Sequence, residues 1–176
     1  MLLIRRHFII FLFFFILVFC CKPKTYEEPE KDRGATKEQM IAVNRMLVRK
    51  DRQQIKDFID SNSIAMTETP TGLWFNIDKE GEGPKVKAGD IIEIDYRITL
   101  LDGTECYNSQ TDDTKKFRVG KGGVESGLEE AVLMLRKGSK AKFIMPPHLA
   151  HGLTGDGNKI PARAIIFYEV EVLSLE

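Results

Sequence analysis

The stretch SGLEEAVLMLRKG, residues 126–138, decides the fold. Its apolar side chains recur at i, i+3, i+4 and i+7, which predicts a short amphipathic helix (Leu128, Ala131, Val132 and Leu135). Ser126 and Glu129 match a capping box at its start, and Gly138 stands where a left-handed C-cap is expected. A helix of about nine residues is too short to be stable alone. The apolar stripe must therefore pack onto a sheet.

The segments around this helix alternate between apolar and polar residues. Residues 92–100 (IEIDYRITL) give the clearest period of two, and the following Leu-Asp-Gly predicts a hairpin turn. Further strands are predicted over 73–77, 117–119, 140–146 and 164–175, with a long loop over 147–161. Strands with one apolar face, hairpins and one helix predict an α+β fold, a curved antiparallel sheet wrapped around that helix.

Residues 1–21 have the pattern of an export signal. Arg5 and Arg6 precede an unbroken apolar run over 8–19, shorter than the roughly 20 residues of a spanning helix. The run ends in two cysteines and resembles a bacterial lipoprotein signal, with Cys21 as the expected lipidated residue and Cys20 as the alternative. The other reading is an uncleaved apolar anchor. Either reading predicts a membrane-anchored protein outside the cytoplasm, in the periplasm or cell envelope.

A tether and a second helix are predicted between this signal and the sheet. Residues 22–35 are charged and contain two prolines, which indicates a flexible tether. Thr36 and Gln39 match a capping box that opens a helix over 36–62, and Asp51 interrupts its apolar stripe. This helix either packs on its own domain or, through residues 36–60, forms a dimer or binds a partner. The domain itself is expected over 72–176.

Composition excludes several classes of function. The chain has 26 basic and 26 acidic residues without a basic patch, so nucleic acid is not an expected partner. His148 and His151 lack an evident third ligand, so neither a metal nor another cofactor is expected. If Cys21 carries lipid and residues 1–20 are removed, Cys106 is the single free thiol and cannot form an internal disulfide.

The order and spacing of these strands, helix and loop over residues 72–175 resemble the FKBP-type peptidyl-prolyl cis-trans isomerase domain. The resemblance implies a half-barrel fold that acts on proline-containing polypeptides. It implies a proline pocket formed by seven residues (Tyr96, Phe117, Val124, Leu128, His151, Ile160 and Tyr168). It also implies a pocket rim of three residues (Cys106, Tyr107 and Glu125).

Several pocket positions depart from the pattern of that family. Leu128 stands where the family usually has a tryptophan at the pocket floor, and Lys115 replaces a phenylalanine of the wall. His151 replaces a tyrosine, Glu125 an isoleucine, and the pair Cys106-Tyr107 a Phe-Asp pair. These changes predict a pocket that is more polar than usual, and the loss of the tryptophan and of the acidic residue suggests poor binding of macrolide inhibitors.

The resemblance leads to a prediction of function with one main alternative. The barrier to rotation of a peptide bond is ~18–20 kcal/mol, and a dry pocket can lower it without a cofactor. We expect a lipid-anchored isomerase acting on exported proteins. The alternative is a weak or inactive FKBP-like binding or assembly module, since the architecture also resembles FKBP-type lipoproteins linked to gliding motility in the Bacteroidetes group. A general holdase chaperone is a third possibility.

Overall fold

The computed structural model describes residues 36–176. The predicted signal with Cys20 and Cys21 and the predicted tether (1–35) lie outside the described residues. The chain divides into two units, residues 1–40 and 41–176, and the sheet lies in the second. None of the helices in the described part combines the length and apolar character needed to cross a bilayer.

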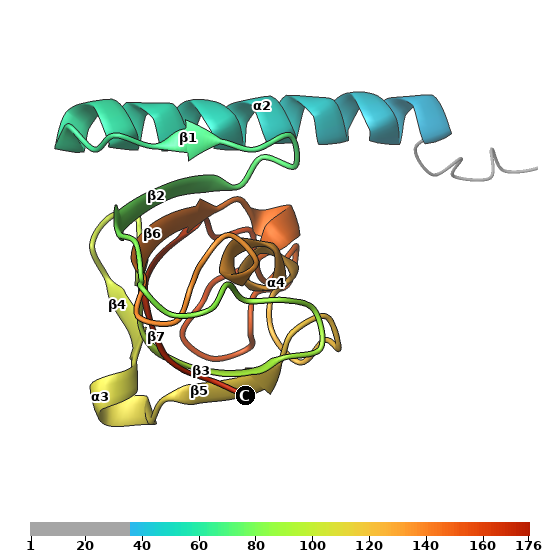
Figure 1. The fold of residues 1–176 in the computed structure, drawn as a ribbon. Coiled ribbons are helices and arrows are strands. Elements are labelled where there is room, and N and C mark those ends of the chain that lie inside the picture. The colour runs from blue at the N-terminus through green and yellow to red at the C-terminus, as the bar shows by residue number, and fades with distance from the viewer. Residues whose placement is uncertain (1–35) are drawn as a thin grey trace, which may run out of the picture. The chain divides into compact units, whose positions relative to one another are not determined.

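One antiparallel sheet of seven strands forms the domain. Its order is β1-β2-β6-β7-β3-β4, and β5 also pairs with β3. The strands are β1 (Thr67–Glu68), β2 (Trp74–Lys79), β3 (Ile91–Leu100), β4 (Glu105–Asn108), β5 (Lys115–Arg118), β6 (Lys140–Met145) and β7 (Ile166–Leu175). The sheet curves around α4 (Ser126–Val132), as Figure 1 shows. This arrangement confirms the predicted α+β fold.

Strand β3 lies between β7 on one side and β4 and β5 on the other, and its alternation gives it one buried face. Ile92, Ile94 and Ile98 are at most 2% exposed, and the strand pairs with β7 along nearly its whole length. At its end the Leu100 N–H donates to the Thr104 carbonyl at 2.9 Å, and Gly103 has φ +88°. The hairpin predicted from the Asp-Gly pair is therefore present.

Helix α4 packs through the predicted apolar stripe, but neither of its ends has the predicted cap. Leu128, Ala131 and Val132 are 0% exposed, which confirms the apolar stripe. The predicted capping box is wrong, because the Glu129 carboxylate instead accepts hydrogen bonds from the Gly120 and Gly122 N–H groups at 2.6 and 3.1 Å. It therefore closes the preceding loop rather than the helix.

The C-terminal cap predicted at Gly138 is also wrong. Helix α4 ends at Val132, well before this glycine. Gly138 does have a positive φ of +88°, but its N–H donates to the Val172 carbonyl on β7 at 2.9 Å. The glycine thus serves the turn into β6.

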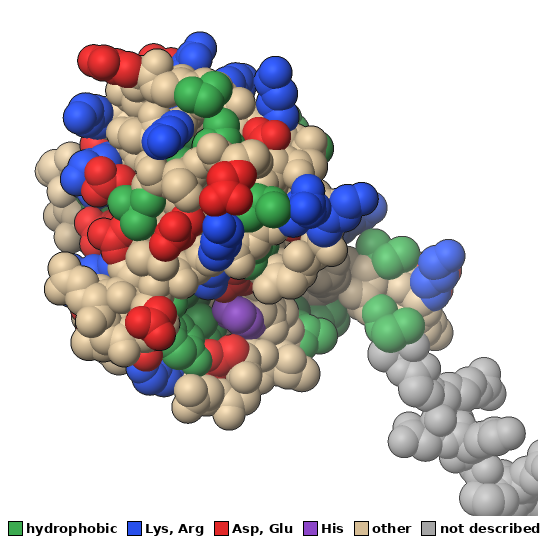
Figure 2. All heavy atoms as spheres, turned by 60° about the horizontal axis from the view of Figure 1, so that its bottom comes forward, with side chains coloured by type: hydrophobic (Ala, Val, Ile, Leu, Met, Phe, Trp, Pro, Cys, Tyr) green, Lys and Arg blue, Asp and Glu red, His purple; other side chains and the backbone are tan. Residues whose placement is uncertain are grey.

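Cross-strand ion pairs occupy the polar positions of the strands. Lys140 on β6 and Glu171 on β7 lie 2.8 Å apart, and Arg97 and Glu105 lie 2.7 Å apart. Acidic and basic side chains are also interspersed on the face displayed in Figure 2. The surface on that face therefore carries mixed charge rather than a patch of one sign.

Helix α2 (Lys37–Asn62) starts with the predicted capping box. The Thr36 N–H donates to Gln39 Oε1 at 2.8 Å, and the Gln39 N–H donates to Thr36 Oγ1 at 3.3 Å. Further along, Ile55 is 1% exposed and packs with Trp74, Ile144 and Ile165 in a second apolar cluster. The helix therefore covers the sheet with its C-terminal half.

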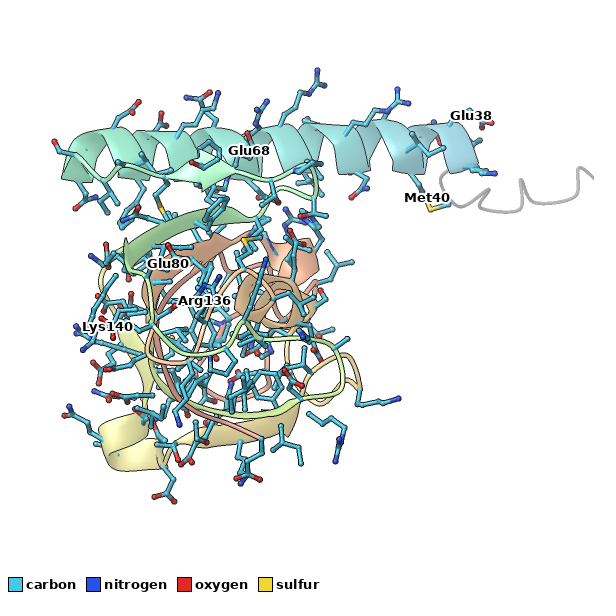
Figure 3. All side chains as sticks on the ribbon, viewed as in Figure 1. Glu38, Met40, Glu68, Glu80, Arg136 and Lys140 are labelled. Atoms are coloured by element: carbon cyan, nitrogen blue, oxygen red, sulfur yellow. The ribbon has the colours of Figure 1, made fainter. Side chains whose placement is uncertain are left out.

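This packing buries both sides of the chain at the start of β2, at Leu73 and Trp74. Leu73 belongs to the main core, whereas the neighbouring Trp74 belongs to the cluster under α2. The segment over 64–71, between α2 and β2, contains β1, whose Glu68 receives hydrogen bonds from Arg52 of α2. Figure 3 labels Glu68 beside this helix. Part of α2 stays exposed, notably Val43 and Met46 at 53% and 57%.

Two irregular segments complete the domain. The polar stretch after β4 contains a single helical turn, α3 (Ser109–Asp112). The β6–β7 loop (residues 146–165) begins with the 3₁₀ turn η1 (Pro147–Leu149). This loop carries His151 and Ile160 and thus two of the predicted pocket positions.

Candidate functional site

The base of the site is a set of five buried side chains, here called the pocket floor. They come from β3, β5, α4, the β6–β7 loop and β7, belong to one core cluster and are at most 9% exposed (Tyr96, Phe117, Leu128, Ile160 and Tyr168). The rings of Tyr96 and Tyr168 lie 6.0 Å apart. Five of the seven predicted pocket residues thus form one apolar surface with two hydroxyl groups.

A small hollow of about 430 Å³ adjoins this floor through Val124, which packs against the same core cluster. It is lined by Val124 and by three polar side chains, here called the polar rim (Lys115, Glu125 and His151). His151 Nε2 lies 3.1 Å from Glu125 Oε1, and the Glu125 side chain is only 6% exposed. The two remaining predicted pocket residues, Val124 and His151, therefore meet at this hollow together with predicted rim residue Glu125.

Lys115 connects the polar rim to the pocket floor. Its ammonium group donates to the Tyr168 hydroxyl at 2.7 Å and lies 4.9 Å from the centre of the Tyr96 ring. It is also 3.7 Å from Glu125 Oε2, which is too long for a hydrogen bond, so that buried oxygen has no hydrogen-bond partner within residues 36–176. A basic group thus sits over the tyrosines where the resemblance implies a phenylalanine.

The tyrosine hydroxyls of the floor remain protonated over a wide pH range. Burial raises the pKa of Tyr168 well above 10, and the nearby Glu125 and Tyr96 raise it further. Burial likewise raises the pKa of Tyr96, helped by the carboxylates of Asp112 and Glu125. Both groups therefore act as neutral hydrogen-bonding groups rather than as acids or bases.

Tyr107 and Asp156 form a second polar contact at the edge of the site. The Tyr107 hydroxyl donates to Asp156 Oδ2, and Asp156 Oδ1 accepts from the backbone N–H groups of Asn158 and Ile160, both at 2.8 Å. Burial alone would raise the pKa of Asp156, but these three hydrogen bonds outweigh it and lower the pKa to about 2. The Asp156 carboxylate thus stabilises the turn that positions Ile160.

Cys106 is a predicted rim residue, but its side chain is buried in the main core. The residue is 2% exposed and belongs to the main core, because it occupies an inward-facing position of β4. Its Sγ lies 3.6 Å from the Lys159 carbonyl oxygen. The side chain therefore supports the β6–β7 loop from below and is not available to a substrate.

Asp156 and Arg163 are site-linked residues that sequence reasoning missed. The Gly-Asp-Gly-Asn stretch at 155–158 is a turn signal that could have drawn attention to Asp156. Gly155 has φ +74°, and a Cβ there would lie 2.3 Å from the Ile160 carbonyl oxygen, so the turn requires glycine. Across residues 36–176, no group of three or more His, Cys, Asp or Glu residues could hold a metal ion.

An antiparallel sheet curved around one short helix, with an apolar cluster beside a small hollow, is the architecture that the sequence resemblance implies. The model of the family "FKBP-type peptidyl-prolyl cis-trans isomerase" matches residues 83–173. The chain therefore belongs to the FKBP-type peptidyl-prolyl cis-trans isomerase family.

Individual relatives agree with this assignment. The FKBP-type isomerase FkpA of Aeromonas hydrophila is 39% identical over 108 residues, 61% of this chain and 40% of the relative. FK506-binding protein 2 of Dictyostelium discoideum is 37% identical over 92 residues, 52% of this chain and 69% of the relative. The chain thus spans less than half of the Aeromonas protein.

Solved structures show the same fold. The crystal structure of FkpA from Escherichia coli superposes with a TM-score of 0.63 at 28% identity, covering 80% of this chain and 66% of that one. The crystal structure of AtFKBP13 gives 0.61 at 26% identity, covering 64% of this chain and 99% of that one.

Proposed function

We propose that this protein is a peptidyl-prolyl cis-trans isomerase of polypeptides outside the cytoplasm. The observation that carries the proposal is the pocket floor, where five residues distant in sequence share one buried apolar cluster against which Val124 of the hollow also packs. Membership of the isomerase family supports the same conclusion. The hollow is small, which suits a proline ring and its neighbouring peptide groups.

The chemistry requires only binding and desolvation. A planar peptide bond is stabilised by charge-separated resonance, and the twisted transition state has less of it. An apolar floor packed against Val124 would remove water from the bond and so favour the twisted state. To reach that floor a proline ring must displace the Lys115 ammonium group from above Tyr96 and Tyr168. We therefore expect a slower enzyme than one with an open aromatic pocket.

An exchange assay on a short X-Pro peptide tests this function. Val124→Glu places a charge in the hollow and should reduce kcat/KM by about tenfold or more, since each ~1.4 kcal/mol of lost stabilisation is a factor of ten. Leu173→Glu is the matched control, because Leu173 is a 41% exposed apolar residue on β7. No acceleration by the wild-type protein, or equal loss in both variants, contradicts the proposal.

The place of action rests on the sequence pattern of residues 1–21. A basic start, an apolar run and a terminal cysteine pair support export and lipid attachment at Cys21, with Cys20 as the alternative. The tether over 22–35 would then separate the catalytic domain from the membrane surface. Exported, proline-containing polypeptides are the substrates that this position would make available.

A binding or assembly role is the second candidate, and an exposed part of α2 favours it. Ile41, Val43, Met46 and Val48 are each more than 40% exposed on this helix. An apolar surface of this kind suits a dimer or a partner protein, such as a component of secretion or gliding-motility machinery. Met46→Lys together with Val43→Lys should abolish association measured by light scattering and co-purification. Unchanged association would count against this role.

A further inference from the structure

A buried carboxylate joins α2 to the loop that builds the site. Asp51 of α2 is 7% exposed, and its two carboxylate oxygens lie 3.0 and 2.8 Å from Nη2 of Arg163, 112 residues further along the chain. A buried charge is costly unless it is paired, so this contact fixes the position of both side chains. Arg163 belongs to the β6–β7 loop.

The backbone of Arg163 makes a second connection. Its φ is +59°, a conformation that residues other than glycine seldom adopt and that must be held by surrounding contacts. In this conformation its N–H donates to the Gly152 carbonyl at 3.0 Å. The side chain of Arg163 thus contacts α2 while its backbone contacts the residue next to His151.

From Gly152 the connection continues into the polar rim. The Gly152 N–H donates to the Pro147 carbonyl at 2.8 Å, which closes the first turn of the loop. His151 then contacts Glu125, and Glu125 contacts Lys115 above the pocket floor. The same loop presents Ile160, three residues before Arg163. The β6–β7 loop therefore contributes to the site at His151 and at Ile160, and Arg163 is fixed near the C-terminal end of this loop.

We propose that Asp51 and Arg163 are positioning residues for the isomerase site. Helix α2, through this ion pair, sets the geometry of the β6–β7 loop and hence of His151 and Ile160. The inference rests on the proposed isomerase function and adds to it a role for the helix in activity as well as in covering the sheet.

A second ion pair on the same helix supplies a matched control. Arg52 follows Asp51 directly and donates to Glu68 of β1 at 2.8 Å, but this pair does not involve the β6–β7 loop. Loss of either pair weakens the attachment of α2 to the sheet. Only loss of the Asp51–Arg163 pair should also disturb the site.

The test compares Asp51→Asn and Arg52→Gln in the full protein. Asp51→Asn should lower kcat/KM for an X-Pro peptide by about three- to tenfold, in the range of coupling through contact networks, and mainly by lowering kcat. It should also move the backbone amide NMR signals of His151 and Gly152. Arg52→Gln should leave both the kinetic constants and those signals unchanged. Both measurements are made at a temperature well below the unfolding midpoint of each variant, so that changes in the kinetic constants and NMR signals do not reflect partial unfolding.

Arg163→Gly keeps the result interpretable if Asp51→Asn folds poorly. Glycine tolerates the positive φ and retains the N–H to Gly152, so this change removes the ion pair without straining the loop. It should reproduce the kinetic loss, and the double variant Asp51→Asn/Arg163→Gly should lose little more than either single variant.

Three outcomes overturn the inference: equal effects of Asp51→Asn and Arg52→Gln, a loss of stability without a change at His151 and Gly152, or additive kinetic losses in the double variant. If the wild-type protein shows no isomerase activity, the proposed function fails. The NMR comparison then still decides whether α2 positions the loop.

Discussion

At the residue scale, Lys115 makes this site unlike an apolar proline pocket. Its ammonium group contacts the Tyr168 hydroxyl, the Tyr96 ring and the Glu125 carboxylate. A substrate of the proposed isomerase would have to break these contacts before its proline could reach the floor. We therefore expect the polar rim to lower the affinity of the site for apolar ligands, although the apolar floor itself is intact.

Removing this charge should raise activity. Lys115→Met keeps an unbranched side chain of similar length but loses the ammonium group, so kcat/KM should increase by about threefold to tenfold. The Glu125 carboxylate then loses its nearest cation, and stability should fall by about 1–3 kcal/mol. Lys116→Met is the control, because Lys116 is exposed and pairs with Glu176. A decrease in kcat/KM for Lys115→Met would show that the cation assists the reaction.

Asp156 should make the stability of the fold depend on pH in the acid range. Its pKa of about 2 in the folded protein lies below the ordinary value of 3.8, so the ionised carboxylate stabilises the fold above pH 3.8. That contribution is lost as the pH falls from 3.8 to about 2. Because the group is partly solvent-exposed, we expect it to amount to about 1 kcal/mol.

The comparison with Asp156→Asn measures this contribution. At pH 6 the variant should unfold at lower denaturant concentration than the wild type, and the difference should shrink toward pH 2. A difference that stays constant over this range would assign the effect to geometry rather than to charge.

At the scale of elements, α2 is attached to the sheet through its C-terminal half. Ile55→Ala should lower the free energy of unfolding by about 2–5 kcal/mol, because Ile55 is 1% exposed among Trp74, Ile144 and Ile165. Met46→Ala on the same helix should change it by less than about 0.5 kcal/mol, since Met46 is 57% exposed. Denaturant unfolding of both variants measures the difference. Similar values for the two would mean that the helix is not packed in solution.

The elements with a regular apolar period could be predicted from the sequence. Strand β3, the stripe of α4 and the Asp-Gly hairpin depend on local pattern, and the structure has all three. Contacts between distant segments could not be predicted in this way. Asp51 looked like an interruption of an apolar stripe, because its partner Arg163 follows 112 residues later. Glu129 matched a local capping box but closes the preceding loop instead.

The same distinction applies to the site. Buried positions such as Tyr96, Leu128 and Tyr168 follow from the resemblance combined with strand and helix periodicity. The contact of Lys115 with Tyr168 joins β5 to β7, which are both neighbours of β3 but far apart in sequence. Only the folded sheet reveals that a lysine and a glutamate share this small hollow.

At the scale of the whole molecule, the proposed isomerase would work beside a membrane. The face of the domain in Figure 2 carries mixed charge, so that face gives little reason for binding to anionic lipid. Attachment would therefore depend on residues 1–21, with the predicted tether setting the distance to the bilayer. Substitution of the two cysteines tests this arrangement independently of catalysis.

Lipid attachment at Cys21 predicts a specific pattern of labelling. The wild-type protein expressed in a bacterium should incorporate labelled palmitate and partition into the detergent phase, because two or more acyl chains anchor a protein stably. Cys21→Ser should remain unlabelled and appear in the aqueous phase, whereas Cys20→Ser should behave like the wild type, because the signal would still end in a modifiable cysteine. Labelling lost only in Cys20→Ser would move the site to the alternative residue. Labelling absent from all three, with membrane retention unchanged, would instead identify the apolar run as an uncleaved anchor.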